Sequence, residues 1–594
     1  MLIKRIYTKA RSLILKNHLK DIKVLILFSA LTGIVEIFAI TAFLPFLEFV
    51  VSGKDSLLTK KLLDFETIQN LSHNYKVCFL ALICVFLILF SNLSKIFMLL
   101  KIGKFMAKLE AYLSSKILSS IMSKPHSWFE GRNLTEIAKY PLSESSHLVA
   151  VCFQPLLNYT TSIIITSMLI ITALIVEPFV VITVFLFLGS ILIAYFKCTA
   201  SYVSRNADMR GQMNTKRYVY INDILNSIRE IKLYKADNFF KNRYHETANA
   251  FTKAQVMAQL IGNLPRFILE ALLLTLSIFL IVAVTIAKGG INDVIPQVGF
   301  FCIFLLRVLP YIQNIYNSKN QFNYGLPVLN EFIDIVDSSS ELNLSSCSTK
   351  NDTQQIRIKN LKYLSKDARK LILNINSLKI SSGEKIAVIG HSGSGKSTLM
   401  KLLCGFLKES DSIKFTSSDL HVISNCTHQD NVSYVPQKIE CNTQSVRESI
   451  TLGDDLIKDD DIMKIIKILK LDSVINDKSV LDEMLVGANL NFSGGELQRL
   501  NIARALCRNR SWLIFDESCS ALDPVIEKNI LNNIFKIKTQ CTIVMTTHRF
   551  ENLHLFDRVL QMKNGEILEI NNLNRLKNSE IMKQVNSKIQ PKSS

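Results

Sequence analysis

The feature that most constrains the fold is a series of long apolar runs in the first half of the chain. Each run is about as long as a helix that crosses the roughly 30 Å hydrocarbon core of a bilayer, and each holds few or no charges. Residues 355–594 instead alternate apolar and polar side chains, which is typical of a globular domain. We therefore predict a membrane domain followed by a soluble domain. The six predicted spans are Val24 to Val51, Val77 to Leu93, Pro155 to Val176, Phe179 to Phe196, Phe267 to Ala287 and Pro296 to Ile312.

Basic residues beside these runs predict the orientation of the chain. The formal net charge is +19, and residues 1–23 carry seven Lys and Arg against one acid. Residues 197–260 carry eleven against five. Because basic loops mark the cytoplasmic side of a membrane protein, we place the N-terminus and the two long loops inside. Aromatic residues are not interleaved with these basic residues, so no nucleic-acid partner is expected.

The two long inner loops are rich in helix-forming residues. We expect them to continue the membrane spans as helices into the cytoplasm, with tips near His126 to Leu134 and Ala207 to Asn214. Such tips would contact the soluble domain and transmit movement between the two parts. The alternative is that these are ordinary solvated helices without a coupling role.

Several ionisable residues fall inside or at the edge of the predicted spans: Glu36, Lys95, Arg266, Glu270 and Arg307. A central charge costs about 2.5–3.5 kcal/mol on insertion, so such residues usually face a partner or a water-filled cavity. We treat Arg266, Glu270 and Arg307 as candidates for a substrate path. Alternatively, Lys95 and Arg266 extend toward a membrane surface, and Glu270 pairs with Arg266 four residues earlier.

A polar, Ser-rich stretch without periodicity follows Asp337 and marks the domain boundary. The predicted domains are a membrane domain at 1–335, a linker at 336–354 and a nucleotide-binding domain at 355–594. The twelve cysteines form no CxxC pair, so neither a zinc site nor a disulfide framework is expected.

A phosphate-binding loop follows an apolar, strand-like segment that ends at Ile389. The loop fits GxxxxGK[ST] and opens a helical pattern, which is the context such a loop needs. In this motif, backbone N–H groups surround phosphate oxygens, Lys396 contacts the β and γ phosphates, and the Ser397 hydroxyl binds Mg²⁺. The nucleotide-binding residues predicted here are Gly390, His391, Ser392, Gly393, Ser394, Gly395, Lys396, Ser397 and Thr398.

A second apolar strand, Trp512 to Phe515, ends in Asp516 and Glu517. A parallel strand would deliver both carboxylates beside the phosphate loop. We expect Asp516 to hold Mg²⁺ through water and Glu517 to act as the general base for the attacking water. An acidic strand end that only meets solvent would show the same pattern.

Between these motifs, Asn491 to Arg499 reads Asn-Phe-Ser-Gly-Gly-Glu-Leu-Gln-Arg and resembles the LSGGQ signature of ABC transporter ATPases. Tyr434 to Gln437 resembles the Q-loop, Ser520 to Asp523 the D-loop, and Thr547 to Arg549 the segment with the switch histidine. The resemblance implies an all-α, six-helix transmembrane domain of exporter type followed by an α/β P-loop NTPase domain.

The resemblance also implies that two nucleotide-binding domains close head to tail on two molecules of ATP with Mg²⁺. The chain would pair with a second copy of itself or with a similar half-transporter. Catalysis is assigned to Glu517, His548 and Gln437, and metal binding to Ser397, Gln437 and Asp516. Tyr363 is expected to stack on adenine. The partner's copy of the signature would contribute Ser493, Gly494 and Gly495.

For the cargo, the membrane half resembles lipid-linked oligosaccharide flippases of the PglK type. The resemblance is carried by Glu36 to Ile40 with Pro45 and Phe46, by Leu264 to Arg266 with Leu269 and Glu270, and by Arg307 to Pro310. It implies ATP-driven movement of a glycolipid to the outer side of the inner (plasma) membrane. Arg266 and Arg307 would bind a pyrophosphate, and residues 58–71 would form an external helix. The alternatives are export of a peptide or toxin, and a regulatory ATPase without cargo.

Overall fold

The computed structural model describes residues 13, 15–52, 73–176, 178–288, 295–337, 352–364, 371–407, 412–417, 421–437, 445–483, 492–519 and 522–570. For some residues within 52, 176–188, 192–301, 323 and 570, the backbone is described but the side chain is not. Contacts divide the chain into two units. One comprises Met1–Lys124 and Gly131–Asn343, and the other comprises Pro125–Glu130 and Leu344–Ser594. The predicted external helix at 58–71 and most of the linker lie outside the described residues.

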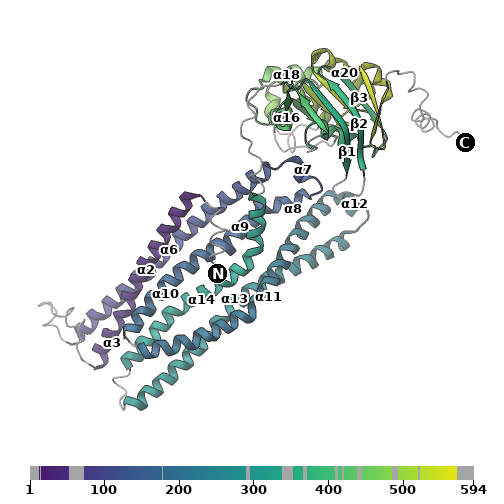
Figure 1. Ribbon diagram of the computed structural model, residues 1–594. Coiled ribbons are helices and arrows are strands. Elements are labelled where there is room, and N and C mark those ends of the chain that lie inside the picture. Colours follow the sequence, from purple (N-terminus) through teal and green to yellow (C-terminus); the bar gives the residue numbers. More distant parts are fainter. Residues whose placement is uncertain are drawn as a thin grey trace. The chain divides into compact units, whose positions relative to one another are not determined.

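The first unit consists of long helices that run side by side (Figure 1). α6 alone has 50 residues, which corresponds to about 75 Å, and it therefore continues far beyond its apolar run. The segment that follows the second predicted span is therefore helical as far as Met122. The long helices are α2 (Lys16–Thr41), α6 (His73–Met122), α10 (Gln154–Val176), α11 (Pro178–Asn226), α13 (Asp237–Lys288) and α14 (Ile295–Asp337).

Short elements complete this unit. They are α3 (Phe43–Ser52), α8 (Leu134–Lys139), η1 (Tyr140–Glu144), α9 (Ser145–Leu148), η2 (Val149–Phe153) and α12 (Ile228–Leu233). At Gly325 on α14, an added Cβ would lie 2.6 Å from Cys152 Sγ, so the glycine permits α14 to approach η2 closely.

Three stretches of the described residues are long and apolar enough to cross a membrane: Lys16–Val51, His73–Met122 and Leu134–Ile175. They contain the first two predicted spans and all but the last residue, Val176, of the third. The other three predicted spans lie on α11, α13 and α14, where many side chains fall outside the description. The count of six spans stays a prediction.

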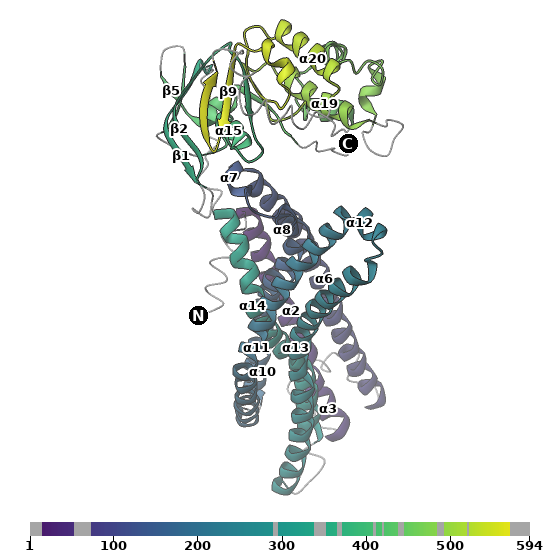
Figure 2. The same cartoon turned by 90° about the vertical axis from the view of Figure 1, so that its right-hand side faces the viewer.

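The predicted tip of the second inner loop was wrong. Residues 207–214 lie within the continuous helix α11, and the chain reverses at α12, between α11 and α13 (Figure 2). The sequence between residues 207 and 214 offers polar residues but no helix stop, whereas Lys235, after α12, has a positive φ of 53°. The first tip was predicted correctly, because α6 ends at Met122 and α8 begins at Leu134.

Between α6 and α8, the short helix α7 (His126–Phe129) belongs to the second unit. The His126 ring stacks on Phe406 with centroids 4.8 Å apart, and Glu130 Oε1 accepts a hydrogen bond from Lys401 Nζ at 3.0 Å. Within this unit, residues 126–130 therefore make specific contacts with residues that follow the phosphate loop.

The second unit is an α/β domain whose described strands form two sheets. The four-stranded sheet is antiparallel with order β2-β1-β4-β5, and the six-stranded sheet has order β10-β9-β3-β8-β7-β6, parallel from β9 to β6. The strands are β1 (Gln355–Leu364), β2 (Leu371–Ser381), β3 (Lys385–Gly390), β4 (Ile413–Thr416), β5 (Val422–Ile423), β6 (Val432–Val435), β7 (Trp512–Phe515), β8 (Thr542–Thr546), β9 (Arg558–Lys563) and β10 (Glu566–Ile570).

Strand β3 shows why these residues form a central strand. Ile386 and Val388 are buried in one apolar cluster, whereas Ala387 and Ile389 are buried in another, on the opposite face. A strand covered on both faces reads as a continuous apolar run rather than an alternation. The covering helices are α15 (Lys396–Leu403), α16 (Asn425–Gln429), α17 (Val446–Thr451), α18 (Asp459–Ile468), α19 (Gly494–Cys507) and α20 (Pro524–Ile537).

A buried ion pair joins η1 to α11 in the helical unit. Glu144 accepts hydrogen bonds from Arg210 at 2.9 Å and from Asn214 at 2.6 Å, and all three side chains are buried. Removing one partner of such a pair leaves an uncompensated buried charge.

We predict that Glu144→Ala destabilises the protein by about 3–5 kcal/mol, because Arg210 loses its carboxylate partner. The control is Asp208→Ala, which removes an exposed carboxylate from the same helix as Arg210. Thermal unfolding in detergent should show a clearly lower melting temperature for the first variant only. Equal melting temperatures would show that the ion pair contributes nothing to stability.

Candidate functional site

The predicted phosphate loop connects β3 to the N-terminus of α15. Gly395 caps this helix with a φ of +103°, a conformation that side-chain-bearing residues rarely adopt. A Cβ at this position would lie 2.8 Å from Leu373 Cδ2. The glycine therefore permits both the turn and the packing of the loop against β2, as the motif requires.

A cavity of about 580 Å³ lies over this loop. Lys396 is buried, and its Nζ donates to the carbonyls of Gly390 at 3.0 Å and His391 at 3.1 Å. Gln437 and Glu517 come to the same cavity from distant parts of the sequence. The predicted loop residues that line it are Ser392, Gly393, Gly395, Lys396, Ser397 and Thr398.

Ser397 and Asp516 lie next to each other, as a metal site requires. The Ser397 hydroxyl donates to Asp516 Oδ1 at 3.1 Å, and the Tyr434 hydroxyl donates to Oδ2 at 3.2 Å. Burial raises the pKa of Asp516, while both hydrogen bonds oppose this shift. One carboxylate and one hydroxyl fit Mg²⁺, which usually takes one or two carboxylates together with phosphate oxygens and water. The bound ion would neutralise charge on the phosphates.

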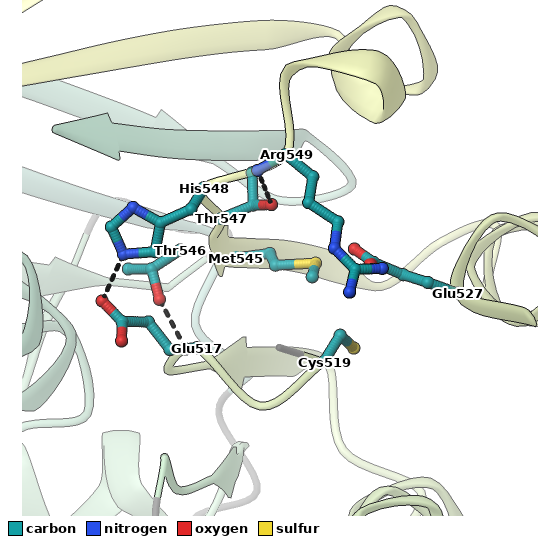
Figure 3. Close-up of a pocket in the computed structure, with 8 residues that line it drawn as sticks. All are labelled: Glu517, Cys519, Glu527, Met545, Thr546, Thr547, His548 and Arg549. Atoms are coloured by element: carbon teal, nitrogen blue, oxygen red, sulfur yellow. Dashed lines mark hydrogen bonds and ion pairs between the residues drawn. The ribbon is translucent and has the colours of Figure 1, made fainter. Parts of the chain in front are cut away.

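The Glu517 carboxylate is the centre of the site. His548 Nε2 lies 2.9 Å from Oε1, Gln437 Nε2 donates to Oε2 at 2.6 Å, and Lys396 Nζ lies 3.6 Å from Oε1. Figure 3 shows the ring of His548 directed at this carboxylate. Of the three predicted catalytic residues, His548 and Gln437 thus each contact Glu517, beside the phosphate loop.

Glu517 also has an unusual backbone. Its φ is +48°, which costs of order 1–3 kcal/mol in a residue with a side chain. The Glu517 N–H donates to Thr546 Oγ1 at 2.6 Å, and this contact holds the strained peptide in place. A strained backbone at Glu517 is consistent with a carboxylate that points into the cavity instead of continuing in the direction of β7.

The sequence assigned no role to Thr546 and did not predict the contact of Tyr434 with Asp516. Thr546 ends β8 and donates to Asp516 Oδ1 at 3.3 Å, and Tyr434 lies on β6. β6 and β8 flank β7 in the parallel sheet. The signal available in the sequence was the position of these polar residues at or near the end of an apolar strand, where parallel strands deliver functional groups.

Arg549 connects the switch segment to the helix after the D-loop, and Figure 3 shows it pointing away from His548. Its NH1 contacts Glu527 Oε2 and its NH2 contacts the carbonyl of Leu522, both at 2.5 Å. Burial raises the pKa of Glu527, and the charge of Arg549 opposes this shift. The guanidinium of Arg549, the residue after the switch histidine, therefore joins this segment to Leu522 and Glu527, which lie next to the D-loop. Ser520 of the D-loop lies outside the described residues.

The signature segment lies apart from the described lining of the phosphate-loop cavity, which includes none of Ser493, Gly494 and Gly495. Ser493 caps α19 in a capping box with Glu496, and both Ser493 and Gly494 are exposed. Glu496 Oε2 accepts the Ser493 N–H at 2.7 Å and its hydroxyl at 2.8 Å. The Ser493 N–H lowers the pKa of Glu496.

Tyr363 lies on β1, opposite Leu373 of β2, and packs partly against the core between the sheets. It is not among the described residues that line the phosphate-loop cavity. Residues 365–370, which connect β1 to β2, lie outside the description. The stacking of Tyr363 on adenine stays a prediction.

A second polar cluster lies among the helices of the first unit. Glu36 on α2 is fully buried and accepts hydrogen bonds from Lys95 of α6 and Tyr311 of α14. Arg307 NH1 lies 3.7 Å from the same carboxylate and 3.5 Å from Asn92 Oδ1. Glu270 on α13 is exposed, and the Arg266 side chain lies outside the description, so the proposed pairing of these two is untested.

Comparison with known proteins agrees with this architecture. Residues 373–520 match the ABC transporter family, and residues 22–307 match the ABC transporter transmembrane region. In three dimensions, the chain is similar to a bacterial Atm1-family ABC exporter with ATP bound, with a TM-score of 0.78, 17% identity, and coverage of 98% of this chain and 100% of that one.

Two curated relatives match shorter parts. The leukotoxin export ATP-binding protein LtxB of Aggregatibacter actinomycetemcomitans is 33% identical over 238 residues, 40% of this chain and 34% of LtxB. The mesentericin-Y105 transport/processing ATP-binding protein MesD of Leuconostoc mesenteroides is 27% identical over 372 residues, 58% of this chain and 49% of MesD. The chain thus spans about a third and a half of the length of these relatives.

The chain therefore carries an ABC transporter transmembrane region fused to an ABC-type ATPase domain. Its fold is that of the similar exporter structure, a helical membrane domain followed by an ABC ATPase domain, which confirms the fold class predicted from the sequence.

We predict that Glu496→Gln lowers the ATP concentration needed for half-maximal ATPase activity, by roughly threefold, because it removes a negative charge from the helix end expected to meet the γ phosphate. Gln can still accept the Ser493 N–H, so the capping box is kept. The control is Glu448→Gln, which alters the equivalent capping box of α17. An unchanged ATP dependence in Glu496→Gln would show that this carboxylate does not oppose nucleotide.

Proposed function

We propose that the chain is one half of an ATP-driven exporter that moves a lipid-linked oligosaccharide or related glycolipid from the cytoplasmic to the outer side of the inner (plasma) membrane. The observation that carries the proposal is the fusion of a complete set of ATPase contacts around Glu517 to helices long enough to span a bilayer. The N-terminus and the ATPase domain would lie in the cytoplasm.

In the proposed ATPase step, Glu517 orients and deprotonates the attacking water, because it is the carboxylate nearest the phosphate-loop lysine. His548 and Gln437 hold its two oxygens and would pass from this carboxylate to nucleotide contacts when ATP is bound. Lys396 would leave the loop carbonyls to meet the β and γ phosphates.

The proposed partner is a second copy of the chain or a similar half-transporter. Ser493 and Gly494 are exposed, and with Gly495 they lie outside the described lining of the phosphate-loop cavity, which supports a role in a site on another subunit. ATP held between the phosphate loop of one subunit and Ser493, Gly494 and Gly495 of the other would close the dimer. Hydrolysis would open it again.

We predict that Glu517→Gln lowers ATPase activity by about a hundredfold or more, since it removes the general base but keeps the hydrogen-bonding shape. With ATP and Mg²⁺, the variant should stay closed, which a cross-link between Cys residues introduced at Ser493 and at Ser392 of the other subunit would detect. Asp472→Asn, which neutralises an exposed carboxylate elsewhere in the ATPase domain, serves as the control. ATP hydrolysis at the wild-type rate in Glu517→Gln would show that Glu517 is not the general base.

The cluster around Glu36 supports an anionic cargo. Among the described residues in contact with one another there, two cations, Lys95 and Arg307, face the single carboxylate of Glu36. Both cations are partly exposed, with 30% and 21% of their side chains accessible. An excess positive charge in apolar surroundings favours an anionic group such as a pyrophosphate, which a guanidinium binds with two parallel hydrogen bonds.

A peptide or toxin is the second candidate cargo. LtxB and MesD are named for leukotoxin export and for mesentericin transport and processing, respectively. LtxB resembles this chain over only 238 residues. The named cargo of these relatives therefore supports the peptide hypothesis less directly than the charge cluster supports an anionic lipid.

We predict that Arg307→Ala removes most of the stimulation of ATPase activity by a pyrophosphate-linked oligosaccharide in proteoliposomes and slows its movement at least tenfold, because a bidentate phosphate contact is lost. Arg229→Ala, an exposed arginine on α12, is the control. If peptides are moved instead, the peptide hypothesis holds. If ATP is hydrolysed and no cargo moves, the regulatory ATPase hypothesis is favoured.

A further inference from the structure

A polar cavity of about 420 Å³ lies within the helical unit, between η2, α11, α13 and α14. Five side-chain amides line it: Gln255, Asn263, Asn317, Asn320 and Gln321. The remaining described lining consists of His147, Tyr324 and three small apolar side chains. No Lys, Arg, Asp or Glu appears in this described lining. The cavity is therefore polar but nearly uncharged, and it differs in chemistry from the cluster around Glu36.

The floor of the cavity holds polar groups without partners. Tyr324 is 6% exposed, and its hydroxyl has no hydrogen-bond partner among the described residues. The same holds for Nε2 of His147 and Oδ1 of Asn317. A buried polar group without a partner costs about 1–3 kcal/mol, so several of them around one cavity indicate that a ligand completes their bonding.

Helix geometry arranges these groups as one surface. Asn317 is followed three and four residues later by Asn320 and Gln321, and each of these two precedes Tyr324 by four or three residues, so all four lie along one face of α14. The His147 ring meets Tyr324 edge-on, with centroids 5.7 Å apart, and so fixes the end of this row. Gln255, Asn263 and Gln321 are exposed, which places them at the mouth of the cavity.

We infer that this cavity binds the neutral, hydroxyl-rich sugar portion of the cargo. Each amide offers both donors and an acceptor, and each sugar hydroxyl also donates and accepts, so the two groups match without any charge. A volume of about 420 Å³ is within the range of small-ligand sites. The inference rests on the proposed function and identifies which part of the cargo this site recognises.

A peptide fits the lining less well. The backbone groups of the surrounding helices are bonded within the helices, so they offer no edge along which an extended peptide could pair. The described apolar lining consists of Ala150, Val151 and Val203, which are too few and too small to form pockets for large apolar side chains. A charged small molecule would in turn lack a counter-ion in the described lining.

The test compares two tyrosines in the full-length protein. Tyr324→Phe removes the unpartnered hydroxyl from the cavity and keeps the ring. The control is Tyr159→Phe: Tyr159 is half-buried on the neighbouring helix α10 and is not part of the described lining. Thermal unfolding verifies that both variants fold.

The probes are free N,N′-diacetylchitobiose, farnesyl pyrophosphate with and without this disaccharide, and an uncharged ten-residue peptide. We expect Tyr324→Phe to weaken binding of both sugar-bearing probes about fivefold to tenfold, which corresponds to the loss of one hydrogen bond. Binding of farnesyl pyrophosphate should not change, and Tyr159→Phe should leave all affinities unchanged. A double variant with Asn317→Leu should lose more sugar affinity.

The two proposals fail in different ways. If the free disaccharide does not bind, or binds wild type and Tyr324→Phe equally, the sugar site is rejected even when the lipid-linked probe is transported. A peptide whose binding depends on Tyr324 also overturns it. If the free disaccharide binds through Tyr324 but no lipid-linked probe is moved, the site stands and the proposed cargo transport fails.

Discussion

The structure depends on one constraint, that a charge in apolar surroundings needs a partner of opposite sign or several hydrogen bonds. Four buried carboxylates meet it in four places: Glu36 with Lys95, Glu144 with Arg210, Asp516 with Ser397 and Tyr434, and Glu527 with Arg549. Each joins elements far apart in sequence. In both the helix bundle and the ATPase domain, a single substitution at these contacts would leave a buried charge without its partner. The contacts of Asp516 and Glu527 belong to the ATPase domain.

The chemistry of the ATPase site could be read from the sequence because its motifs are local. The phosphate loop occupies nine consecutive residues, and Asp516 and Glu517 are adjacent at the end of an apolar strand. A parallel sheet brings strand ends together, so these motifs were expected to meet, and Lys396 lies 3.6 Å from Glu517. What the sequence could not supply was the strand order, because nothing local states that β8 and β6 flank β7. The contacts of Thr546 and Tyr434 with Asp516 were not predicted for that reason.

The second inner turn was misplaced for a different physical reason. Residues 207–214 include several polar side chains, but polar residues on an exposed helix face do not end a helix, and α11 continues through them. The actual reversal needs a residue with positive φ, and Lys235 supplies it without a glycine. In the membrane region, Glu36 and Arg307 were recognised as unusual, yet their mutual contact joins residues 271 positions apart and has no local pattern.

The two polar regions of the helical unit differ in the physical basis of recognition. The cluster around Glu36 acts through charge, which is strong at a distance in a low-dielectric region but poor at distinguishing one anion from another. The amide cavity acts through short, directional hydrogen bonds, which bind weakly but depend on where each hydroxyl lies. A half-transporter that uses both can hold any lipid pyrophosphate loosely through the first and select among head groups through the second. Selectivity then lies in neutral side chains such as Tyr324 and Asn317, which hydropathy and charge patterns do not single out.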